Sequence, residues 1–480
     1  MAVFEASPEG FRAMNLGRPA AHLVRELVQN VLDEAAETCH VDVKWTPKKG
    51  IHIRVTDDLY GGIREERLIF TIWESDKQDS PTKRGRMGRG LKEMVSVSDW
   101  TSVATQGRPT TLFERSPNGD WSRKTTKTIP SPAVGTIVET QVKAWSEKDA
   151  EEIVKYLKSI RAPKDMVLFV NGEEVKRKPH LEAYNMRLSS VVFTVENNER
   201  RVSNSGFQTV VELFPEAEPK IYEMGLPIET IDFPLSIDVQ QRIPLREQRD
   251  TLVTWYRVEL FAKLLSARID HMPTESLRDN YVLKAAEGIH YLSDAAMQKI
   301  ANAWTEGKPY AASPQMMSVA TGQHVQVVNL RTLPEAIRDL VKKVGTDVKQ
   351  VLRERQTEFC PHVEPTYEEK RLINCWEWIA EGINKPCVVV VAAGKPNAEA
   401  SFDRSGNILT IYKEVLGEDF FRAPLKVQQL GLLIHELAHW KIHEESHGAN
   451  FHSDAENVGA AVAVFLMENY YEATQKGSAI

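Results

Sequence analysis

The chain has 480 residues, 42% of them hydrophobic and 26% charged, a composition typical of a globular protein with about three domains. The formal net charge of −7 argues against a protein whose main task is to bind nucleic-acid phosphates, although it leaves room for a local basic patch. No apolar run approaches the roughly 20 residues of a membrane-spanning helix, and the N-terminus has no secretory signal pattern. The four cysteines form no CxxC pair, which favours reduced thiols in a cytoplasmic protein.

The first predicted domain spans residues 1–178. Residues 20–38 carry leucine and valine at helical spacing along one broad face. Short strand-like runs follow, then the helix pattern "EKDAEEIVKYLKSI" and the pattern "MVLFVNGEEV", in which Asn171 and Gly172 signal a tight hairpin. Helices and strands in this order predict an α+β layer sandwich.

The rest of the chain divides into a second domain, a linker and a C-terminal domain. Residues 179–304 begin with strand patterns and end in helix patterns at 250–269 and 280–304. Residues 305–333 begin as a polar stretch with prolines and no sustained period, so we expect a linker there. Residues 334–480 combine mostly helical patterns with the strand run "PCVVVVAA" and the hairpin pattern "ASFDRSGNILTIYKE".

Polar side chains recur at one-turn intervals in the helix "RELVQNVLDEA". Glu26, Asn30 and Asp33 stand at i, i+4 and i+7, so they project from one face. Such a stripe can simply face water. These residues are embedded among apolar ones, however, and Asn30 offers an oxygen ligand for Mg²⁺ while Glu26 offers a base for a water molecule.

A second candidate position lies in "VTDDLYGGI". Asp57 falls at the end of a strand, before a turn that contains Gly61. A carboxylate in this place can accept a hydrogen bond from an exocyclic amine of a ligand. The alternative is an ordinary turn aspartate.

A glycine-rich segment follows in "KRGRMGRGLKEM". Gly85, Gly88 and Gly90 form a GxxGxG loop that runs into a helix at Leu91. Glycine lets the backbone approach phosphate oxygens closely, and a helix N-terminus offers free N–H groups to anions. Later, "VGTIVET" places the hydroxyl of Thr136 at the start of a strand. Each signal is weak alone, so their order carries the interpretation.

In this order the motifs resemble those of the GHKL ATPase superfamily, which includes gyrase, the heat-shock chaperone ATPases, histidine kinases and MutL. The matching segments are E-L-V-x-N-x-x-D at 26–33, D-x-x-x-G at 57–61, G-x-x-G-x-G-L at 85–91 and G-T at 135–136. The resemblance implies an ATP-binding α/β sandwich in which Glu26 activates water, Asn30 holds Mg²⁺ and Asp57 reads adenine. It also assigns these residues to nucleotide binding: Asp33, Gly61, Gly85, Gly88, Gly90, Leu91 and Thr136.

One position departs from the family pattern. Leu59 stands where the family has the first glycine of D-x-G-x-G, so we expect a differently shaped turn at the adenine pocket. The presence of Glu26 favours hydrolysis over the phosphate transfer that histidine kinases perform.

The second domain occupies the place of the transducer domain in gyrase-like and MutL-like members. In those proteins a basic residue reaches the terminal phosphate, and the resemblance offers Arg242 and Arg246 for that part; surface arginines beside a turn are the alternative. The resemblance also implies an ATP-dependent homodimer. The overall arrangement is loosely similar to phage rIIA-like ATP-binding proteins.

The stretch "LLIHELAHWKIH" carries His-Glu-x-x-His. On a helix, His435 and His439 lie one turn apart on the same face and can reach one zinc ion, and Glu436 can act as general base for the bound water. A helix that merely holds two histidines at this spacing is the alternative. The preceding strand and hairpin patterns resemble zincin-type peptidases, which bind peptides along an edge strand beside this helix.

Two residues compete as the third zinc ligand. His447 ranks first, because "HGANF" resembles the third-histidine segment of SprT-like metallopeptidases. Glu456 ranks second, because Ser453-x-x-Glu456 also predicts a capping box at the start of the last helix.

The leading hypothesis is a GHKL ATPase whose nucleotide-driven conformational change controls a C-terminal zinc metallopeptidase-like domain that acts on a protein substrate. The alternative is a conformational ATPase that serves as a scaffold or clamp on nucleic acid or protein, with a structural or inactive metal site. The substitution Glu436→Gln separates the two, because it abolishes proteolysis under the first hypothesis and leaves function intact under the second.

Overall fold

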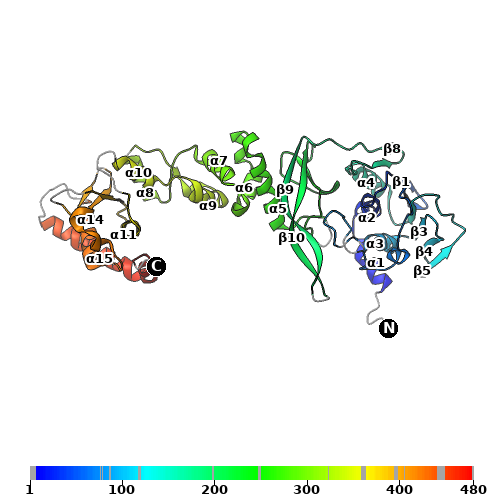
Figure 1. Ribbon diagram of the computed structural model, residues 1–480, viewed down its shortest axis with the longest axis horizontal. Helices are drawn as coiled ribbons and strands as arrows, with labels where there is room; N and C mark the ends of the chain where they lie inside the picture. The colour runs from blue at the N-terminus through cyan, green and yellow to red at the C-terminus, as the bar shows by residue number, and fades with distance from the viewer. Residues whose placement is uncertain are drawn as a thin grey trace. The chain divides into compact units, whose positions relative to one another are not determined.

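The computed structural model describes residues 7–477 except 76, 78, 86–87, 117–120, 197–198, 247–249, 323, 358–363, 394–397, 405 and 441–448. The chain forms two compact units, residues 1–264 and 265–480 (Figure 1). Both units combine helices with sheets, which confirms the predicted α+β, multidomain fold class. The boundary at residue 264 falls inside the second predicted domain, 179–304.

The first unit contains an eight-stranded sheet with the order β5-β4-β3-β6-β2-β1-β7-β8. Its strands are β1 (Thr38–Thr46), β2 (Gly50–Asp57), β3 (Trp100–Thr105), β4 (Thr110–Arg115), β5 (Trp121–Thr126), β6 (Thr136–Val142), β7 (Val167–Val170) and β8 (Glu173–Glu174). Strands β1 and β7 pair in parallel, and the other neighbours pair antiparallel. The β7–β8 hairpin turns at Asn171 and Gly172, both with positive φ, as an Asn-Gly turn requires.

Helices cover this sheet and form the main core of the unit. Helix α2 (Ala20–Leu32) buries its leucine and valine face against β1 and β2, in a core shared with α3 (Gly90–Val97) and α4 (Glu147–Leu157). Helix α1 (Pro8–Leu16) packs on α3, and a 3-10 turn (Glu66–Ile69) follows β2. Helix α2 ends earlier than the predicted residue 38, because β1 already begins at Thr38.

A second sheet completes the first unit, with the order β12-β11-β13-β10-β9. Its strands are β9 (Glu182–Glu196), β10 (Glu199–Phe214), β11 (Lys220–Glu223), β12 (Leu226–Thr230) and β13 (Ser236–Val239). Strands β9 and β10 form a long antiparallel hairpin, whereas β11 and β13 pair in parallel. Helix α5 (Thr254–Arg268) follows.

Arg161 joins the two sheets of the first unit. This residue follows α4 and is 2% exposed. Its Nη2 donates to Glu212 Oε2 of β10 at 3.0 Å, its Nη1 donates to Asp238 of β13, and its backbone N–H donates to Gly225 O at 2.9 Å. Removing one partner of a buried ion pair costs about 3–5 kcal/mol. The buried ion pairs of Arg161 therefore fix the second sheet of the first unit to the segment that follows α4.

The second unit begins with short helices. They are 3-10 turns at Ile269–His271, Thr274–Arg278 and Ile289–Tyr291, with α6 (Asn280–Ala286), α7 (Asp294–Thr305) and α9 (Glu335–Val344). The helix pattern over 280–304 is divided in two, because Ser293 caps a new helix: its Oγ accepts from Ala296 N–H at 3.2 Å.

Residues 305–333, expected to be a linker, instead carry buried structure. They contain β14 (Tyr310–Ala311), α8 (Pro314–Gly322), β15 (Val328–Asn329) and a 3-10 turn (Leu330–Thr332). Met316 and Val319 of α8 lie in one core with Val388 and Val390. The residues around them are polar or proline, so the sequence shows no sustained helical period that would predict this burial.

The C-terminal part contains a three-stranded sheet, β16-β18-β17. Its elements are α10 (Val348–Thr357), α11 (Tyr367–Gly382), β16 (Val388–Ala392), β17 (Ala400–Asp403), β18 (Ile408–Tyr412), α12 (Lys413–Leu416), α13 (Glu418–Phe421), α14 (Val427–Ala438), α15 (Ala449–Glu468) and α16 (Tyr470–Gly477). Strands β17 and β18 form the predicted hairpin. Helix α15 already begins at Ala449, so Ser453 lies inside it, and the predicted capping box with Glu456 is wrong.

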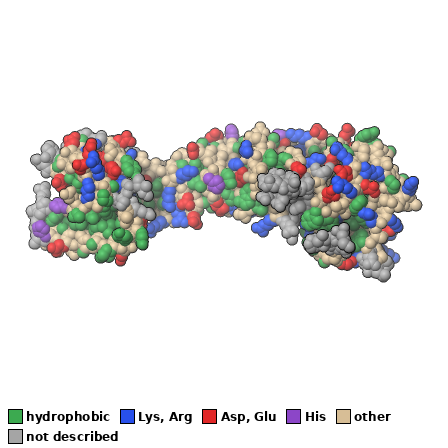
Figure 2. All heavy atoms as spheres, turned by 60° about the horizontal axis from the view of Figure 1, so that its bottom comes forward, with side chains coloured by type: hydrophobic (Ala, Val, Ile, Leu, Met, Phe, Trp, Pro, Cys, Tyr) green, Lys and Arg blue, Asp and Glu red, His purple; other side chains and the backbone are tan. Residues whose placement is uncertain are grey.

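Two expectations from the composition concern membrane-spanning helices and the distribution of surface charge. Among the described helices, none is long and apolar enough to cross a membrane. On the face that Figure 2 shows, basic and acidic side chains intermingle over each unit. That face therefore offers no single-sign surface of the kind that binds a phosphate backbone.

Candidate functional site

A cavity of about 670 Å³ opens in the first unit, which is within the usual range of small-molecule sites. Its wall comes from the end of α1, from α2, from β2 and the turn after it, from the start of β6, and from described residues of the segment 77–90, here called the glycine loop. Of the residues singled out in the sequence, those that line it are Glu26, Asn30, Asp57, Leu59, Gly85, Gly88, Gly90, Leu91, Thr136 and Arg246.

Glu26 and Asn30 reach the cavity from α2. Glu26 is 5% exposed, and its Oε1 lies 3.3 Å from Arg25 Nη2. Asn30, one turn later, is exposed. The carboxylate is thus shielded from bulk water, which strengthens its electrostatic interactions, while the amide is within reach of a ligand in the cavity.

The glycine loop approaches α2 so closely that a side chain at Gly90 would collide. A Cβ there would lie 2.5 Å from Glu26 Oε2. Gly88 has a φ of +59°, and a Cβ there would lie 1.9 Å from Glu74 O. Gly90 opens α3, so the first turn of that helix, with unbonded N–H groups, lines the cavity beside Glu26.

Asp33, assigned to the nucleotide by the family resemblance, lies behind the glycine loop. Its side chain is 0% exposed. Oδ1 accepts from Arg84 N–H and Oδ2 accepts from Gly85 N–H, each at 2.8 Å. It is not part of the described cavity wall, so its position suits a residue that holds the loop against α2.

Asp57 lines the cavity at the end of β2. Its Oδ1 accepts from the backbone N–H groups of Leu59 at 3.0 Å and Thr136 at 3.1 Å. Burial raises the pKa of its carboxyl. Because both backbone bonds use Oδ1, Oδ2 is available to a donor on a ligand. The Oγ1 atoms of Thr136 and Thr105 lie 3.0 Å apart.

The turn after β2 is shaped by Leu59, Gly61 and Gly62. The Leu59 side chain lines the cavity and packs on the core of the unit, so it adds apolar surface where the family pattern has glycine. Gly61 has a φ of +83° but nothing within 4 Å of its Cβ position. Gly62 lines the cavity, and a Cβ there would lie 2.0 Å from Thr105 Oγ1. Gly62, not Gly61, is therefore the glycine in close contact at this wall.

Several charged wall residues were not singled out in the sequence. Lys92 of α3 lines the cavity, its Nζ donates to Leu68 O, and burial lowers the pKa of its ammonium to about 8. Arg18 and Arg89 lie 2.6 Å and 2.7 Å from Glu93, and all three line the cavity. In the sequence, Arg89 stands in the glycine loop and Lys92 and Glu93 follow it, while Arg18 stands just before α2. None of these places distinguishes them from surface charges.

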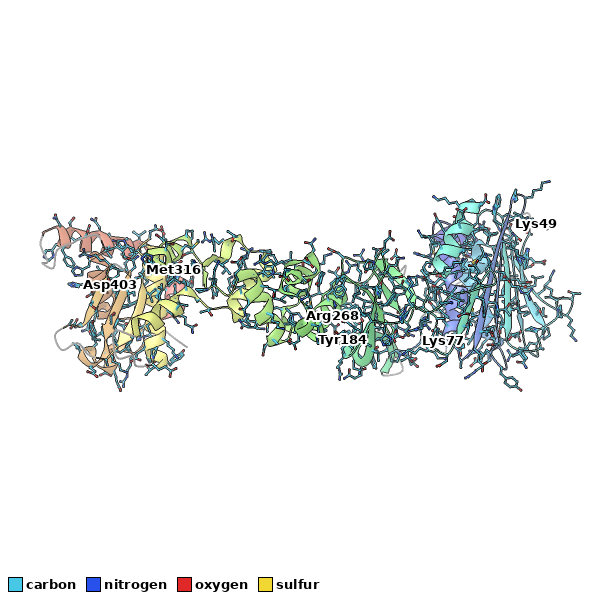
Figure 3. All side chains as sticks on the ribbon, turned by 90° about the horizontal axis from the view of Figure 1, so that it is seen from above. Lys49, Lys77, Tyr184, Arg268, Met316 and Asp403 are labelled. Carbon is cyan, nitrogen blue, oxygen red and sulfur yellow. The ribbon has the colours of Figure 1, made fainter. Side chains whose placement is uncertain are left out.

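The two arginines offered for a terminal phosphate lie in different surroundings. Arg246 is exposed and lines the cavity. Arg242 is fully buried, and its guanidinium donates to backbone carbonyls of the glycine loop, including that of Lys77, which Figure 3 labels. Of the two, Arg246 is the one placed to meet a ligand in the cavity.

A separate candidate site lies in the second unit, on α14. The imidazole centroids of His435 and His439 are 5.4 Å apart, and the ring of Phe451 lies 5.0 Å and 4.6 Å from them. Glu436 is 5% exposed, and burial raises the pKa of its carboxyl to about 7. The last turn of α14 and its C-cap residue, His439, therefore present two imidazoles and a shielded carboxyl.

A sheet edge lies beside this helix. Strand β17 is an edge strand of its sheet, and Phe402 of β17 packs on Trp440 with ring centroids 5.6 Å apart. A sheet edge can accept an extended peptide as a further strand. The arrangement matches the edge strand expected beside the His-Glu-x-x-His helix.

The third ligand of a zinc site is not found among the described residues. His447 lies outside them, and Glu456 is exposed on α15. Within the part of the chain that the structure describes, no group of three or more His, Cys, Asp or Glu side chains could hold a metal ion. The described residues thus contribute two imidazoles, whereas a catalytic zinc site takes three protein ligands.

The sequence matches no protein-family profile and no curated protein. Among solved structures, the chain is similar to the ATPase region of Saccharomyces cerevisiae topoisomerase II, with 12% identity, a TM-score of 0.32, and coverage of 49% of this chain and 78% of that one. For the same region bound to ICRF-187 (dexrazoxane), the identity is 11%, the TM-score 0.32 and the coverage 59% and 86%. For the ATPase and transducer domains of DNA topoisomerase II from Balamuthia mandrillaris, the values are 14%, 0.32, 58% and 70%. A TM-score of 0.32 is too low to support a function. The function proposed below is therefore inferred from the residues of the site.

Proposed function

We propose that the first unit binds ATP together with Mg²⁺ and hydrolyses it in the cavity between α2 and the glycine loop. The main support is the contact between Gly90 and Glu26, where a Cβ would come within 2.5 Å of Oε2. It brings a loop suited to phosphates and a carboxylate suited to water activation together in one cavity.

Four features of the wall then have a defined part in the reaction. Glu26, shielded at 5% exposure, orients the attacking water and accepts its proton. The glycine loop and the first turn of α3 donate N–H groups to the phosphates. Asp57 Oδ2 accepts a hydrogen bond from the exocyclic amine of adenine. Asn30 is the residue that would hold Mg²⁺, whose chemistry is to neutralise the charge that develops on the phosphates.

Equilibrium binding of a fluorescent ATP analogue, with and without Mg²⁺, tests this proposal. We expect the wild-type protein to bind more tightly with Mg²⁺, and Asn30→Ala to lose that gain while still binding the nucleotide. Asn302→Ala is the matched control, because Asn302 lies on α7 and far from the cavity in sequence. A wild-type protein that does not bind ATP at millimolar concentration refutes the proposal.

A second candidate function belongs to the second unit: zinc-dependent peptide hydrolysis at α14. It is supported by the pair of imidazoles 5.4 Å apart and by the neighbouring edge strand β17. His435 and His439 would hold the zinc, with His447 or Glu456 as the third ligand, and Glu436 would accept a proton from water. Zinc, when bound, supplies Lewis-acid activation of that water.

We further propose that nucleotide binding in the first unit controls this peptidase-like site, and that the ATP-bound chain is a cytoplasmic homodimer.

The alternative is an ATPase scaffold or clamp on protein or nucleic acid, with a structural or inactive metal site. Glu436→Gln separates the two. Under the first proposal, cleavage of unfolded casein is lost while ATP turnover persists; under the second, the wild type cleaves no casein and the variant behaves like it.

A further inference from the structure

Arg242 follows β13 and is fully buried, with 0% exposure. Its Nη2 lies within hydrogen-bond distance of three carbonyl oxygens of the glycine loop: Lys77 O at 2.8 Å, Lys83 O at 2.8 Å and Gly85 O at 2.7 Å. Its Nε also donates to Lys83 O at 3.1 Å. One guanidinium thus contacts backbone carbonyls at both ends of the segment 77–85.

The same residue is also anchored in the second sheet. Its Nη1 donates to Val191 O of β9 at 3.3 Å, and its own carbonyl accepts from Ser190 Oγ at 2.7 Å. Its backbone N–H donates to Pro81 O at 2.6 Å. Arg242 is therefore a direct connection between β9, β13 and the glycine loop.

The opposite side of the loop is attached to α2. Asp33, next to the end of α2, accepts the N–H groups of Arg84 and Gly85. The loop thus lies between the helix that carries Glu26 and the sheet that carries Arg242. Because carbonyl oxygens move with their backbone, a shift of the loop breaks several charge-assisted hydrogen bonds to Arg242 at once.

We propose that Arg242 is a positioning residue that locks the glycine loop to the second sheet, so that the loop and the segment after β13 order and open together. The lock itself exists without nucleotide. Its consequence rests on the proposed ATPase function: when a nucleotide orders the loop, Arg242 carries that change directly into the second sheet.

Hydrogen exchange of the full chain without nucleotide tests the lock. The reporters are the amides of Arg84 and Gly85, which are bonded to Asp33. We expect Arg242→Lys to speed their exchange by about tenfold or more, because an ammonium keeps the charge but cannot replace the fork of guanidinium donors. Arg257→Lys is the control. Arg257 of α5 pairs with Glu229 of the second sheet at 2.7 Å, and we expect its substitution to leave the exchange rates of the Arg84 and Gly85 amides unchanged. Equal exchange in Arg242→Lys and wild type overturns the proposal.

The wild-type protein alone decides the matter if Arg242→Lys does not fold. In increasing urea, the lock requires the amides of Arg84, Gly85 and Ile243 to open in one cooperative step with the same dependence on urea. The Ile243 amide is a suitable reporter because it is bonded to Glu223 Oε1 at 3.0 Å. Separate opening of the loop and of Ile243 overturns the lock.

Addition of Mg²⁺ and a non-hydrolysable ATP analogue then tests the consequence. We expect slower exchange at Arg84 and at Ile243 in the wild type, and at Arg84 alone in Arg242→Lys, an effect that general destabilisation does not produce. Slowing at Ile243 in the variant as well overturns the coupling. A wild type that binds no nucleotide refutes the ATPase proposal, while the nucleotide-free comparison still decides the lock.

Discussion

The cavity of the first unit and helix α14 of the second unit are built in opposite ways. The cavity collects Glu26, Asp57, Gly90 and Thr136 from four separate elements, whereas the two imidazoles and the carboxyl of the second unit come from the end of α14 and its C-cap residue, His439. Each cavity motif is a weak signal in the sequence, yet the fold brings them to one place. The His-Glu-x-x-His motif stands in one segment, yet a zinc site also needs a ligand from another segment, and His447 lies outside the described residues. Both sites therefore depend on contacts between segments that are distant in the sequence.

One substitution is expected to disturb the cavity strongly and to leave α14 intact. In Gly90→Ala, the new Cβ would lie 2.5 Å from Glu26 Oε2, so either the carboxylate or the loop must shift. We expect ATP turnover to fall about 100-fold, the loss that a misplaced catalytic group can cause. Gly17→Ala is the control, because nothing lies within 4 Å of its Cβ position. Steady-state phosphate release measures both, and normal turnover in Gly90→Ala would contradict the proposed site.

The reciprocal variant, His439→Ala, breaks α14 and leaves the cavity intact. We expect the zinc content of the purified protein to fall from about one per chain to nearly none, because a catalytic zinc site takes only three protein ligands. ATP turnover should not change. Elemental analysis measures the metal, with His271→Ala as a control outside the motif. Zinc that stays in His439→Ala would place the metal elsewhere.

A third variant, Asp57→Asn, tests whether the cavity recognises the adenine base. Asp57→Asn can still accept the Leu59 and Thr136 N–H groups, but it replaces the remaining oxygen with an amide donor. We expect ATP affinity to fall about 10- to 100-fold, the range for losing a hydrogen bond to a charged group. Isothermal titration measures it. Unchanged affinity would show that Asp57 does not read the base.

The smallest effect concerns pH. The Lys92 ammonium has a pKa of about 8 because it is buried, so it is charged below pH 8 and loses its charge above it. A bound phosphate favours the charged form, and we expect ATP affinity to decline several-fold between about pH 7 and pH 9. In Lys92→Met, affinity should be lower at pH 7 and flat across this range. The same decline in the variant would assign it to another group.

Local patterns in the sequence predict much of this fold. The periodicity of residues 20–38 places α2, and Asn171-Gly172 places a hairpin, because both signals depend on near neighbours. The structure of the stretch 305–333 cannot be predicted in this way, since the burial of Met316 depends on β16, about 70 residues further along the chain. Long-range packing is not visible in a periodicity pattern.

The candidate site shows the same limit. Spacing puts Glu26, Asn30 and Asp33 on one face of α2, but it does not say what approaches that face. In the structure the glycine loop covers Asp33, while Asn30 stays open to the cavity. The positions of Lys92 and Arg242 depend on tertiary contacts that have no sequence signature, so neither environment could be predicted.

We propose above that Glu26 activates the water that hydrolyses ATP in the first unit. Its most direct test is single-turnover hydrolysis of Mg²⁺-ATP by the wild type and by Glu26→Gln, with nucleotide binding measured on the same samples. We expect turnover by the wild type. In the variant we expect nearly unchanged binding and a rate at least about 100-fold lower, the loss expected when a general base is removed. Hydrolysis at the wild-type rate in Glu26→Gln would contradict it, as would a wild type that binds ATP and leaves it intact.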